Sequence, residues 1–454
     1  MKNYPTHDRR IKKPLLAIVL AGGRGTRLRV LTEERCKPEV PVGKNRFIDF
    51  ALANVVNSQI VDHTMILTQY MQQGLINHLG RFQLNAPLWN KFVDVVPAQQ
   101  RLGNESWYIG SANAVYQNHE SIRRDPADTV VILAADHIYK LDIRQFLAYH
   151  HEKESLFTVC GMVMPLALAA GNFGVMELDP DSRILGFEEK PAHPKQLPGR
   201  DGVCFASMGV YIIEKEFLLR ILEEDHFHPG STHDFGKDIV PRLCKKKAPI
   251  YGYDYNDNII SGEVRIVDGV ATPVHYWRDV GKIGAYWEAV MDLVAIDPLL
   301  NVYNPMWPVP TAWDMLPQAK FIFPDRRRYV TDFGESPEGC PFLPDAIMGG
   351  GCIFDSPRNF YKAVFGRSVR TWYGAELTHS IIFDGAEIGE RASLTYTIVE
   401  EGVSVPAFAR TGNDIAVDEA NGVYIDEEHD PNSDHPPIRV ITKNTHWRNM
   451  KQEY

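Results

Sequence analysis

A repeat of 17 residues near the end of the chain constrains its fold more than any other feature of the sequence. A small residue followed by an aliphatic one occurs at 346–347, 363–364, 380–381 and 397–398, and a second apolar column occupies positions 352, 369, 386 and 403. In a parallel β-helix each coil stacks its aliphatic side chains on the coil below, so this period predicts such a helix. Chance alternation in a β-rich tail is the alternative interpretation.

We expect the β-helix domain to occupy residues 341–454. After residue 411 the chain becomes acidic, which predicts a tail that lies at the surface or is partly disordered. Residues 299–340 contain prolines that would interrupt any regular element, so we predict a proline-rich connector there.

The chain before residue 298 alternates between short apolar runs and polar, helix-compatible stretches. This alternation predicts one α/β domain over residues 1–298, with a mostly parallel, doubly wound, Rossmann-like sheet covered by helices on both faces. Ligands of such sheets bind beyond the carboxyl ends of the strands. Gly22 and Asp136 each follow an apolar run, so we expect them at the same edge. The clearest runs are 15–20, 64–67, 129–133, 156–162 and 210–213.

The first of these runs leads into a glycine-rich turn, "AGGRGTRL" at 21–28. Basic residues before the run imitate a secretory signal, but the arginines that follow it at once suit a retained loop better. A dinucleotide-binding fingerprint would need a glycine where Leu28 stands, and the chain has no GxxxxGK[ST] phosphate motif. The stretch therefore predicts a glycine-rich loop that carries arginines.

Composition narrows the class of partner. A net charge of −10 and a pI near 5.9 argue against a nucleic-acid binder, and no apolar run approaches the roughly 18 residues that a membrane helix needs. The six cysteines have no CxxC spacing, which disfavours a zinc site and favours a reducing, cytoplasmic location. Cys36 stands between Arg35 and Lys37, a setting that could lower the pKa of a thiol.

The basic residues of the glycine-rich stretch suit a small anionic ligand. Glycines let backbone N–H groups approach phosphate oxygens, and Arg24, Arg27 and Lys37 would add positive charge where a pyrophosphate leaves. A solvated surface loop with incidental arginines is the alternative for this segment taken alone.

Longer motifs carry a resemblance to a known family. "LAGGRGTRL", followed by "LTEERCKPEVPVG", resembles the signature of sugar nucleotidyltransferases, most closely that of the glucose-1-phosphate adenylyltransferases (ADP-glucose pyrophosphorylases). The resemblance covers nearly the whole chain, and it implies a nucleotidyltransferase domain joined to a left-handed β-helix. The other matching motifs are "RFIDFALANVVNSQI" (46–60), "LTQY" (67–70), "VVPAQQR" (95–101), "WYIGSANAV" (107–115), "VVILAADHIYKLD" (130–142), "FGVM" (173–176), "FEEKPAHP" (187–194), "SMGVYI" (207–212), "HDFGKDIVP" (233–241) and "YWRDVGKIGAYWEA" (276–289).

The resemblance implies roles on the nucleotide side. Asp136 and Asp279 match the family's Mg²⁺-binding positions, and Mg²⁺ takes hard oxygen ligands. A helix N-cap is the alternative for Asp136, and an ion pair with Arg278 is the alternative for Asp279. Arg27 and Lys37 would stabilise the departing pyrophosphate. The triphosphate and its nucleoside would contact Gly22, Gly23, Gly25, Thr26, Gln69 and Tyr108.

The sugar side is implied in the same way. Lys190 would contact the sugar phosphate, and Glu189 and Ser207 would contact sugar hydroxyls. Gly174 and Asp234 complete the predicted sugar-phosphate site. A surface Glu-Lys pair before a proline is the alternative for 189–190, and Asp234 could equally cap a helix.

The implied reaction transfers the adenylyl group of ATP to α-D-glucose 1-phosphate and gives ADP-glucose and pyrophosphate, for glycogen or α-glucan synthesis. The resemblance also implies a homotetramer and a small-molecule allosteric effector. A UDP- or dTDP-glucose pyrophosphorylase and a non-catalytic regulatory subunit are the rival interpretations. The chain departs from the family pattern at Ala135 (usually Gly), Ser111 (Thr) and Asn113 (Asp). Glu34 and Pro41 stand where enzymes activated by fructose 1,6-bisphosphate tend to carry basic residues, which disfavours that activator.

Overall fold

The computed structural model describes residues 14–83, 92–99, 107–312, 315–322 and 344–447. The basic residues at 9–13, much of the predicted connector and Cys340 therefore lie outside the described residues. Within the described part, the chain forms two compact units. Unit 1 contains the chain up to Gly23 together with Ile48–Trp277 and Tyr303–Pro310. Unit 2 contains Arg24–Phe47, Arg278–Val302 and the chain from Thr311 onward.

Unit 1 is built on one twisted sheet with the strand order β10-β9-β11-β6-β1-β4-β5, and β8 pairs with β11 and β12. Strands β6, β1, β4 and β5 run parallel to one another. The strands are β1 (Leu15–Ala21), β4 (Val61–Thr68), β5 (Phe92–Pro97), β6 (Thr129–Ala134), β8 (Phe157–Pro165), β9 (Val175–Leu178), β10 (Ile184–Glu188), β11 (Val203–Glu214) and β12 (Ile250–Asp254).

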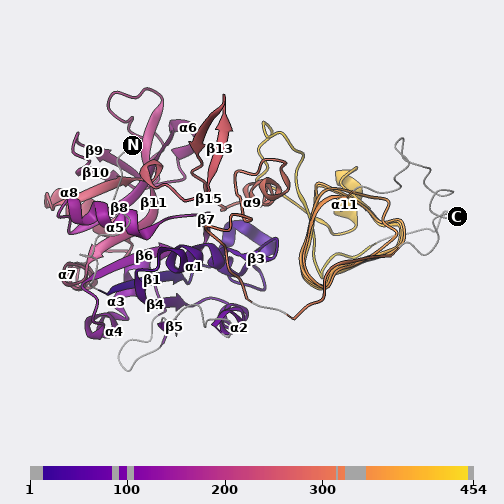
Figure 1. The fold of residues 1–454 in the computed structure, drawn as a ribbon, viewed down its shortest axis with the longest axis horizontal. Helices are drawn as coiled ribbons and strands as arrows, with labels where there is room; N and C mark the ends of the chain where they lie inside the picture. Colours follow the sequence, from indigo (N-terminus) through magenta and orange to yellow (C-terminus); the bar gives the residue numbers. More distant parts are fainter. Residues whose placement is uncertain (1–13, 84–91, 100–106, 313–314, 323–343, 448–454) are drawn as a thin grey trace. The chain divides into compact units, whose positions relative to one another are not determined.

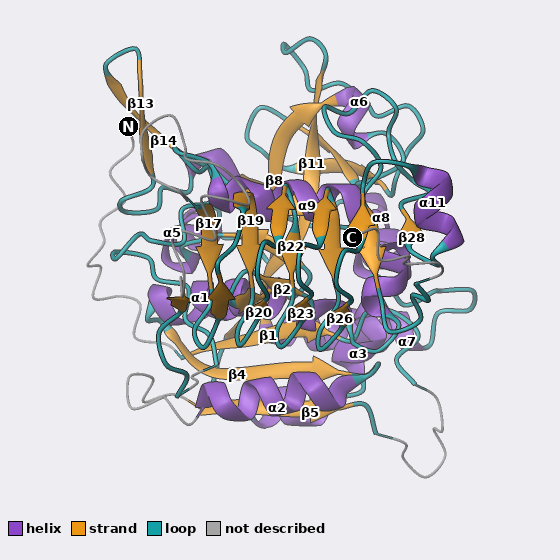
Figure 2. Cartoon of the chain, turned by 90° about the vertical axis from the view of Figure 1, so that its right-hand side faces the viewer, coloured by secondary structure: helices purple, strands orange, loops and turns teal. Residues whose placement is uncertain are grey.

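Four of the five apolar runs lie within these strands and the fifth, 156–162, begins one residue before β8, so the predicted α/β fold is confirmed. Strand β11 runs antiparallel to β6, β8 and β9, which the alternation of runs did not predict. The helices of unit 1 are α1 (Phe47–Ser58), α2 (Gln72–Gln83), α3 (Ser111–Tyr116), α4 (His119–Arg124), α5 (Ile143–Glu152), α6 (Leu166–Ala169), α7 (Lys215–His226), the π-helical turn η4 (Phe235–Ile239), α8 (Val240–Lys245) and the 3-10 turn η5 (Tyr255–Asp257). Short strands β7 (His137–Tyr139) and β15 (Trp277–Asp279) and the projecting hairpin β13 (Val264–Val267) and β14 (Val270–Pro273) complete the elements (Figure 2).

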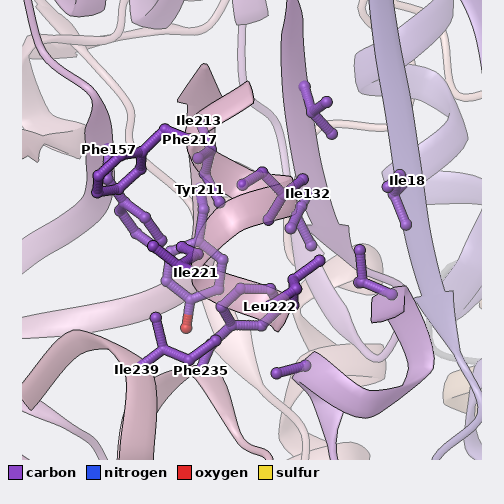
Figure 3. Packing of buried hydrophobic residues seen from close by; sticks show 14 of the residues in the cluster. Ile18, Ile132, Phe157, Tyr211, Ile213, Phe217, Ile221, Leu222, Phe235 and Ile239 are labelled. Atoms are coloured by element: carbon purple, nitrogen blue, oxygen red, sulfur yellow. The ribbon is translucent and has the colours of Figure 1, made fainter. Parts of the chain in front are cut away.

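The core of unit 1 lies between the sheet and its helices. Figure 3 shows Phe157, Tyr211, Phe235 and Leu222 of α7 in one cluster of buried side chains, in which the Phe157 ring contacts those of Tyr211 and Phe235. Tyr211 and Phe235 rings lie 5.3 Å apart, so β11 and η4 are held together by direct aromatic packing. This packing fixes the segment that begins at Asp234.

Unit 2 contains the predicted β-helix, whose coils overlay as a triangle in Figure 1 and as stacked rungs in Figure 2. The 17-residue column is confirmed, because Ile347 pairs with Val364, Val364 with Ile381 and Ile381 with Ile398. Its strands are β16 (Lys320–Ile322), β17 (Asp345–Met348), β18 (Ile353–Asp355), β19 (Asn359–Phe365), β20 (Arg370–Thr371), β21 (Glu376–Thr378), β22 (Ile381–Ile382), β23 (Glu387–Ile388), β24 (Ser393–Thr395), β25 (Thr397–Val399), β26 (Ser404–Val405), β27 (Arg410–Thr411), β28 (Tyr424–Ile425) and β29 (Arg439–Ile441).

The backbone repeats with the side chains. Positions 351, 368, 385 and 402 all have φ between 55° and 74°, and Ser368 is the only one of the four that is not glycine. The left-handed region favours glycine, so the same corner of each coil selects it. Unit 2 also contains η1 (Thr26–Thr32), η2 (Lys37–Glu39), β2 (Pro41–Val42), β3 (Asn45–Arg46), α9 (Ile283–Met291), η6 (Asp292–Val294) and α11 (Ile415–Ala420).

Of the two alternatives predicted for the acidic segment after residue 411, partial disorder is wrong for the described residues, whereas a surface position holds for Glu419, Glu427 and Asp430 but not for Asp418 and Asp426. This segment folds into α11, β28 and β29, and Val440 of β29 pairs with Ile398. Asp418 is buried because its carboxylate accepts hydrogen bonds from the side chain of Arg439 and the backbone N–H of Gly412. The acidic composition of this segment did not show that Asp418 would form a buried ion pair with Arg439.

Candidate active site

The parallel strands of unit 1 bring several predicted residues to one edge of the sheet. Leu20 of β1 lies opposite Leu67 of β4 and Ala134 of β6, so the residues that follow these strands leave the sheet together. Gly22 lies beside Gln69, since a Cβ added to the glycine would be 3.4 Å from the Cβ of Gln69. Asp136 follows β6 at the same edge and precedes strand β7, so the helix N-cap interpretation of Asp136 is wrong. The predicted shared edge is thus confirmed.

Gln69 and Tyr108 contact each other directly. The Tyr108 backbone N–H donates to Oε1 of Gln69 at 2.6 Å, and Nε2 of Gln69 donates to the Tyr108 carbonyl at 3.3 Å. The Tyr108 hydroxyl accepts a bond from Asn118. The amide of Gln69 therefore orients the segment that begins at residue 107, and direct contact of either residue with a nucleotide stays a prediction.

The cationic residues of the glycine-rich stretch gather around one carboxylate in unit 2. Nζ of Lys37 lies 3.3 Å from Oδ1 of Asp279, and the guanidinium of Arg27 lies 3.7 Å from Oδ2. Lys37 is only 4% exposed, whereas the Arg27 side chain is 47% exposed. The ion pairs of Arg278 run to Glu288 and Asp292, which disfavours the interpretation of Asp279 as the partner of Arg278. We call Arg27, Lys37 and Asp279 the phosphate cluster.

Gly25 permits this cluster to form. It has φ of 68°, and a Cβ added there would lie 2.7 Å from the Cβ of Lys37. Only glycine tolerates both the left-handed backbone and this close approach. Thr26 follows as the first, exposed residue of η1, and Gly23 on the other side has nothing within 4 Å of an added Cβ.

The two residues before Lys37, Arg35 and Cys36, are both buried. Arg35 is buried and donates to both carboxylate oxygens of Glu400 at 2.9 Å each, so its charge serves packing on the β-helix. Burial raises the pKa of the Cys36 thiol to about 12, with the Glu39 carboxylate adding to the effect. The position between Arg35 and Lys37 therefore does not lower the pKa of this thiol, because desolvation by burial is the largest effect and outweighs the opposing effect of Arg46.

The predicted sugar residues come together across neighbouring strands of unit 1. Strand β9 pairs with both β10 and β11, so segments that begin near residues 174, 189 and 207 are adjacent in space. The Ser207 backbone N–H donates to the Gly174 carbonyl at 2.8 Å. An added Cβ at Gly174 would lie 2.9 Å from Oε2 of Glu189. We call Gly174, Glu189, Ser207 and Asp234 the sugar pocket, after the contact with the sugar that is predicted for them and that stays a prediction.

Asp234 has two contacts that orient its carboxylate. Oδ1 accepts bonds from the backbone N–H groups of Gly236 and Lys237, so the predicted alternative of a helix cap is confirmed. Oδ2 accepts a bond from the hydroxyl of Ser111 at 2.9 Å. A cap and a ligand group are compatible here, because a carboxylate has about four acceptor positions.

Burial raises the pKa of Glu189, and the nearby Asp234 carboxylate raises it further, while Lys190 and Lys237 oppose the shift. Two carboxylates in one partly buried pocket accept hydrogen bonds well, which suits the hydroxyl donors of a sugar. Lys190 is exposed, and its φ of 51° is a left-handed backbone conformation.

Sequence reasoning missed two residues of this pocket. An added Cβ at Gly236 would lie 2.8 Å from Oε2 of Glu189, so Gly236 makes room for that carboxylate just as Gly174 does. Tyr211 is buried beneath Ser207, and its pKa is raised by burial and by the charges of Asp234 and Glu189. Gly236 belongs to the "DFG" stretch of the sequence, but only the fold shows that the absence of a side chain there leaves room for the Glu189 carboxylate.

The residues present fit a Mg²⁺ ion in their donor chemistry. Asp136 in unit 1 and Asp279 in unit 2 each carry the carboxylate oxygens that Mg²⁺ prefers, and Mg²⁺ is commonly held by one or two carboxylates together with substrate phosphates; that the two bind one ion stays a prediction. Among the described residues there is no group of three or more His, Cys, Asp or Glu side chains that could enclose a metal ion. A site that depends on phosphate oxygens needs no such group.

Comparison with known proteins decides the family. The model of the nucleotidyl transferase family matches residues 16–295, and a GlmU-like C-terminal hexapeptide model matches residues 335–428. A glucose-1-phosphate adenylyltransferase of Nitrosospira multiformis is 39% identical over 92% of this chain and 93% of its own length. The chain belongs to the glucose-1-phosphate adenylyltransferase family.

Other relatives of the same name agree with this assignment. One from Methylococcus capsulatus is 39% identical over 92% of this chain and 93% of its own length, and one from Rhodopirellula baltica is 37% identical over 92% and 89%. The nucleotidyl transferase match contains both the phosphate cluster and the sugar pocket. The hexapeptide match contains the stacked coils, so each predicted part of this nucleotidyltransferase has a counterpart in the family.

Proposed function

We propose that this chain transfers the adenylyl group of ATP to α-D-glucose 1-phosphate and releases ADP-glucose and pyrophosphate, for glycogen or α-glucan synthesis. The observation that carries the choice of substrates is the likeness to glucose-1-phosphate adenylyltransferases over nine tenths of the chain. The sugar pocket supports it, because Glu189 and Asp234 offer paired acceptors to sugar hydroxyls beside the cation Lys190.

The proposed mechanism assigns each group a task. An oxygen of glucose 1-phosphate attacks the α-phosphorus of ATP in line, the bond to the β-phosphate breaks, and pyrophosphate leaves with that electron pair. Arg27 and Lys37 stabilise the charge on the departing pyrophosphate, and Lys190 holds the attacking phosphate. Positioning two highly charged reactants contributes much of the rate enhancement.

Mg²⁺ is the proposed cofactor, held by Asp136 and Asp279. When bound it neutralises phosphate charge. The carboxylate of Asp279 has a second task, because it holds the ammonium of Lys37 in place at 3.3 Å. The glycines at 22, 23 and 25, with Thr26, offer backbone N–H groups to the triphosphate. Gln69 and Tyr108 lie on the nucleoside side.

We further propose a cytoplasmic homotetramer that a small-molecule effector regulates. The described cysteines are free thiols, which suits a reducing compartment. No helix in the described ranges has the length and apolar character needed to cross a membrane. Glu34 pairs with Lys443, and this carboxylate in place of a basic residue disfavours fructose 1,6-bisphosphate as the effector.

The test is pyrophosphate release by the purified chain with Mg²⁺ and α-glucose 1-phosphate, comparing ATP, UTP, dTTP, CTP and GTP. A strong preference for ATP is expected. A preference for UTP or dTTP would keep the mechanism and overturn the named substrate. No release with any triphosphate, from a folded sample, would support the regulatory-subunit interpretation. Size-exclusion chromatography with light scattering tests the homotetramer.

A further inference from the structure

Asp225, which is buried, and His233, which directly precedes Asp234 in the chain, form a pair to which no role has been assigned so far. Oδ2 of Asp225, at the end of α7, lies 2.8 Å from Nδ1 of His233. The other oxygen accepts bonds from Arg242 and from the Ser231 hydroxyl, and this hydroxyl accepts one from the His233 backbone N–H. The Asp225 side chain is only 3% exposed. The imidazole is therefore held in one orientation.

His233 acts on the site through its backbone. Its carbonyl accepts hydrogen bonds from the N–H groups of Ala112 and Asn113, at 2.9 and 3.2 Å, at the start of α3. A side chain at Gly110 would lie 2.2 Å from this carbonyl, so the two segments touch. His233 has φ of 56°, a left-handed conformation that histidine, asparagine and aspartate adopt more readily than other residues with a side chain. The side-chain bond to Asp225 stabilises this turn.

The turn ends directly at Asp234. The Ser111 hydroxyl donates to Oδ2 of Asp234 and accepts a bond from the Phe235 backbone N–H at 3.0 Å. The start of α3 and the start of η4 are therefore joined twice, once through the His233 carbonyl and once through Ser111. The carboxylate of Asp234 depends on both links for its direction.

We propose that His233 is a positioning residue for glucose 1-phosphate: Asp225 fixes its imidazole, the imidazole fixes the left-handed turn, and the turn aims the Asp234 carboxylate into the sugar pocket. This inference rests on the proposed function. Ser111 stands where the family usually has threonine, and the hydroxyl that the two residues share is the group that donates to Asp234.

The test compares two substitutions of His233. His233→Ala loses the bond to Asp225 and disfavours the left-handed turn, so we expect KM for glucose 1-phosphate to rise about tenfold. The KM for ATP and kcat should stay within twofold. His233→Asn should restore most of the affinity, because asparagine tolerates positive φ and its amide can donate to Asp225. His119→Ala, in the neighbouring α4, is the control and should match the wild type.

Three outcomes would overturn the inference while leaving the proposed reaction intact. They are an unchanged KM for glucose 1-phosphate in His233→Ala, an equal rise in the KM for ATP, and equal impairment of the Ala and Asn variants with normal unfolding midpoints. Calorimetric titration of the wild type with glucose 1-phosphate separates the two proposals. Wild-type protein that neither binds this sugar phosphate nor releases pyrophosphate would overturn both.

Discussion

Removal of the Lys37 ammonium tests the phosphate cluster most directly. Lys37 is almost fully buried, and its Nζ lies 3.3 Å from the Asp279 carboxylate, which is itself 11% exposed. At that distance and an effective dielectric constant of about 20, the attraction is about 5 kcal/mol. Loss of one partner of a buried pair destabilises a protein by about 3–5 kcal/mol, because the other charge stays buried. Arg27 remains 3.7 Å from Asp279, so we expect the lower end of that range for Lys37→Ala.

The effect on catalysis should be larger than the effect on folding. A fixed donor aimed at developing charge contributes about 10²–10³ in kcat, and we expect Lys37→Ala to lose that factor in pyrophosphate release. Urea unfolding measures the stability term separately. In the double variant Lys37→Ala/Asp279→Asn the uncompensated charge is gone, so the unfolding midpoint should recover while turnover should not.

Lys44→Ala is the matched control, because Lys44 is an exposed lysine in the adjoining turn between β2 and β3. Its turnover and unfolding midpoint should equal those of the wild type. A folded Lys37→Ala protein whose kcat stays within tenfold of the wild type would refute the role of Lys37 in stabilising pyrophosphate.

Three further substitutions probe the sugar pocket, the glycine-rich loop and the end of the chain. The folded-state pKa of Glu189 is raised, so this group opposes folding once pH exceeds its unfolded value. Glu189→Gln should raise the thermal midpoint at pH 8 but not at pH 3, and should weaken glucose 1-phosphate binding. Gly25→Ala should lower the unfolding midpoint, because the methyl group would meet Lys37 in a left-handed backbone conformation that costs about 1–2 kcal/mol. Asp418→Ala should destabilise unit 2 by about 3–5 kcal/mol, because the Arg439 guanidinium would stay buried without its partner.

Each of these substitutions has a control that differs in one respect. Glu188→Gln changes an exposed carboxylate, and its thermal midpoint should show no such pH dependence. Gly23→Ala places its methyl group in open space and should leave the unfolding midpoint unchanged. Glu419→Ala removes an exposed neighbour of Asp418. Equal effects in any of these pairs would contradict the corresponding structural explanation.

Features with a local period were predictable from the sequence. The strands of the sheet appeared as apolar runs, and the β-helix appeared as columns 17 residues apart that the structure pairs coil by coil. Each of these signals arises because neighbouring residues along the chain, or residues one coil apart, share one buried environment. The edge of the sheet that carries Gly22 and Asp136 followed from the same rule.

Pairings between distant polar side chains were not predictable. Arg35 is two residues from Lys37 in the sequence, yet it binds Glu400, and Asp418 belongs to the predicted acidic tail, yet it binds Arg439. The Asp225–His233 pair left no mark in the sequence. A charged side chain has the same chemistry whether it contacts water, a ligand or a buried partner. The positions of charged residues in the sequence therefore do not reveal which of the three each residue contacts.

The sequence by itself determined the α/β sheet, the β-helix, the family and the residues that could carry the chemistry. The tertiary structure alone decided what each of those residues contacts. Lys37 and Asp279 are 242 positions apart in the chain, and Ser207 lies on β11, whereas Gly174 directly precedes β9 and Glu189 directly follows β10. Hydrophobic periodicity fixes which faces are buried, but the path of the backbone between elements fixes which polar groups meet. These contacts between polar side chains determine how deeply each side chain is buried and which charges surround it, and binding and catalysis depend on both.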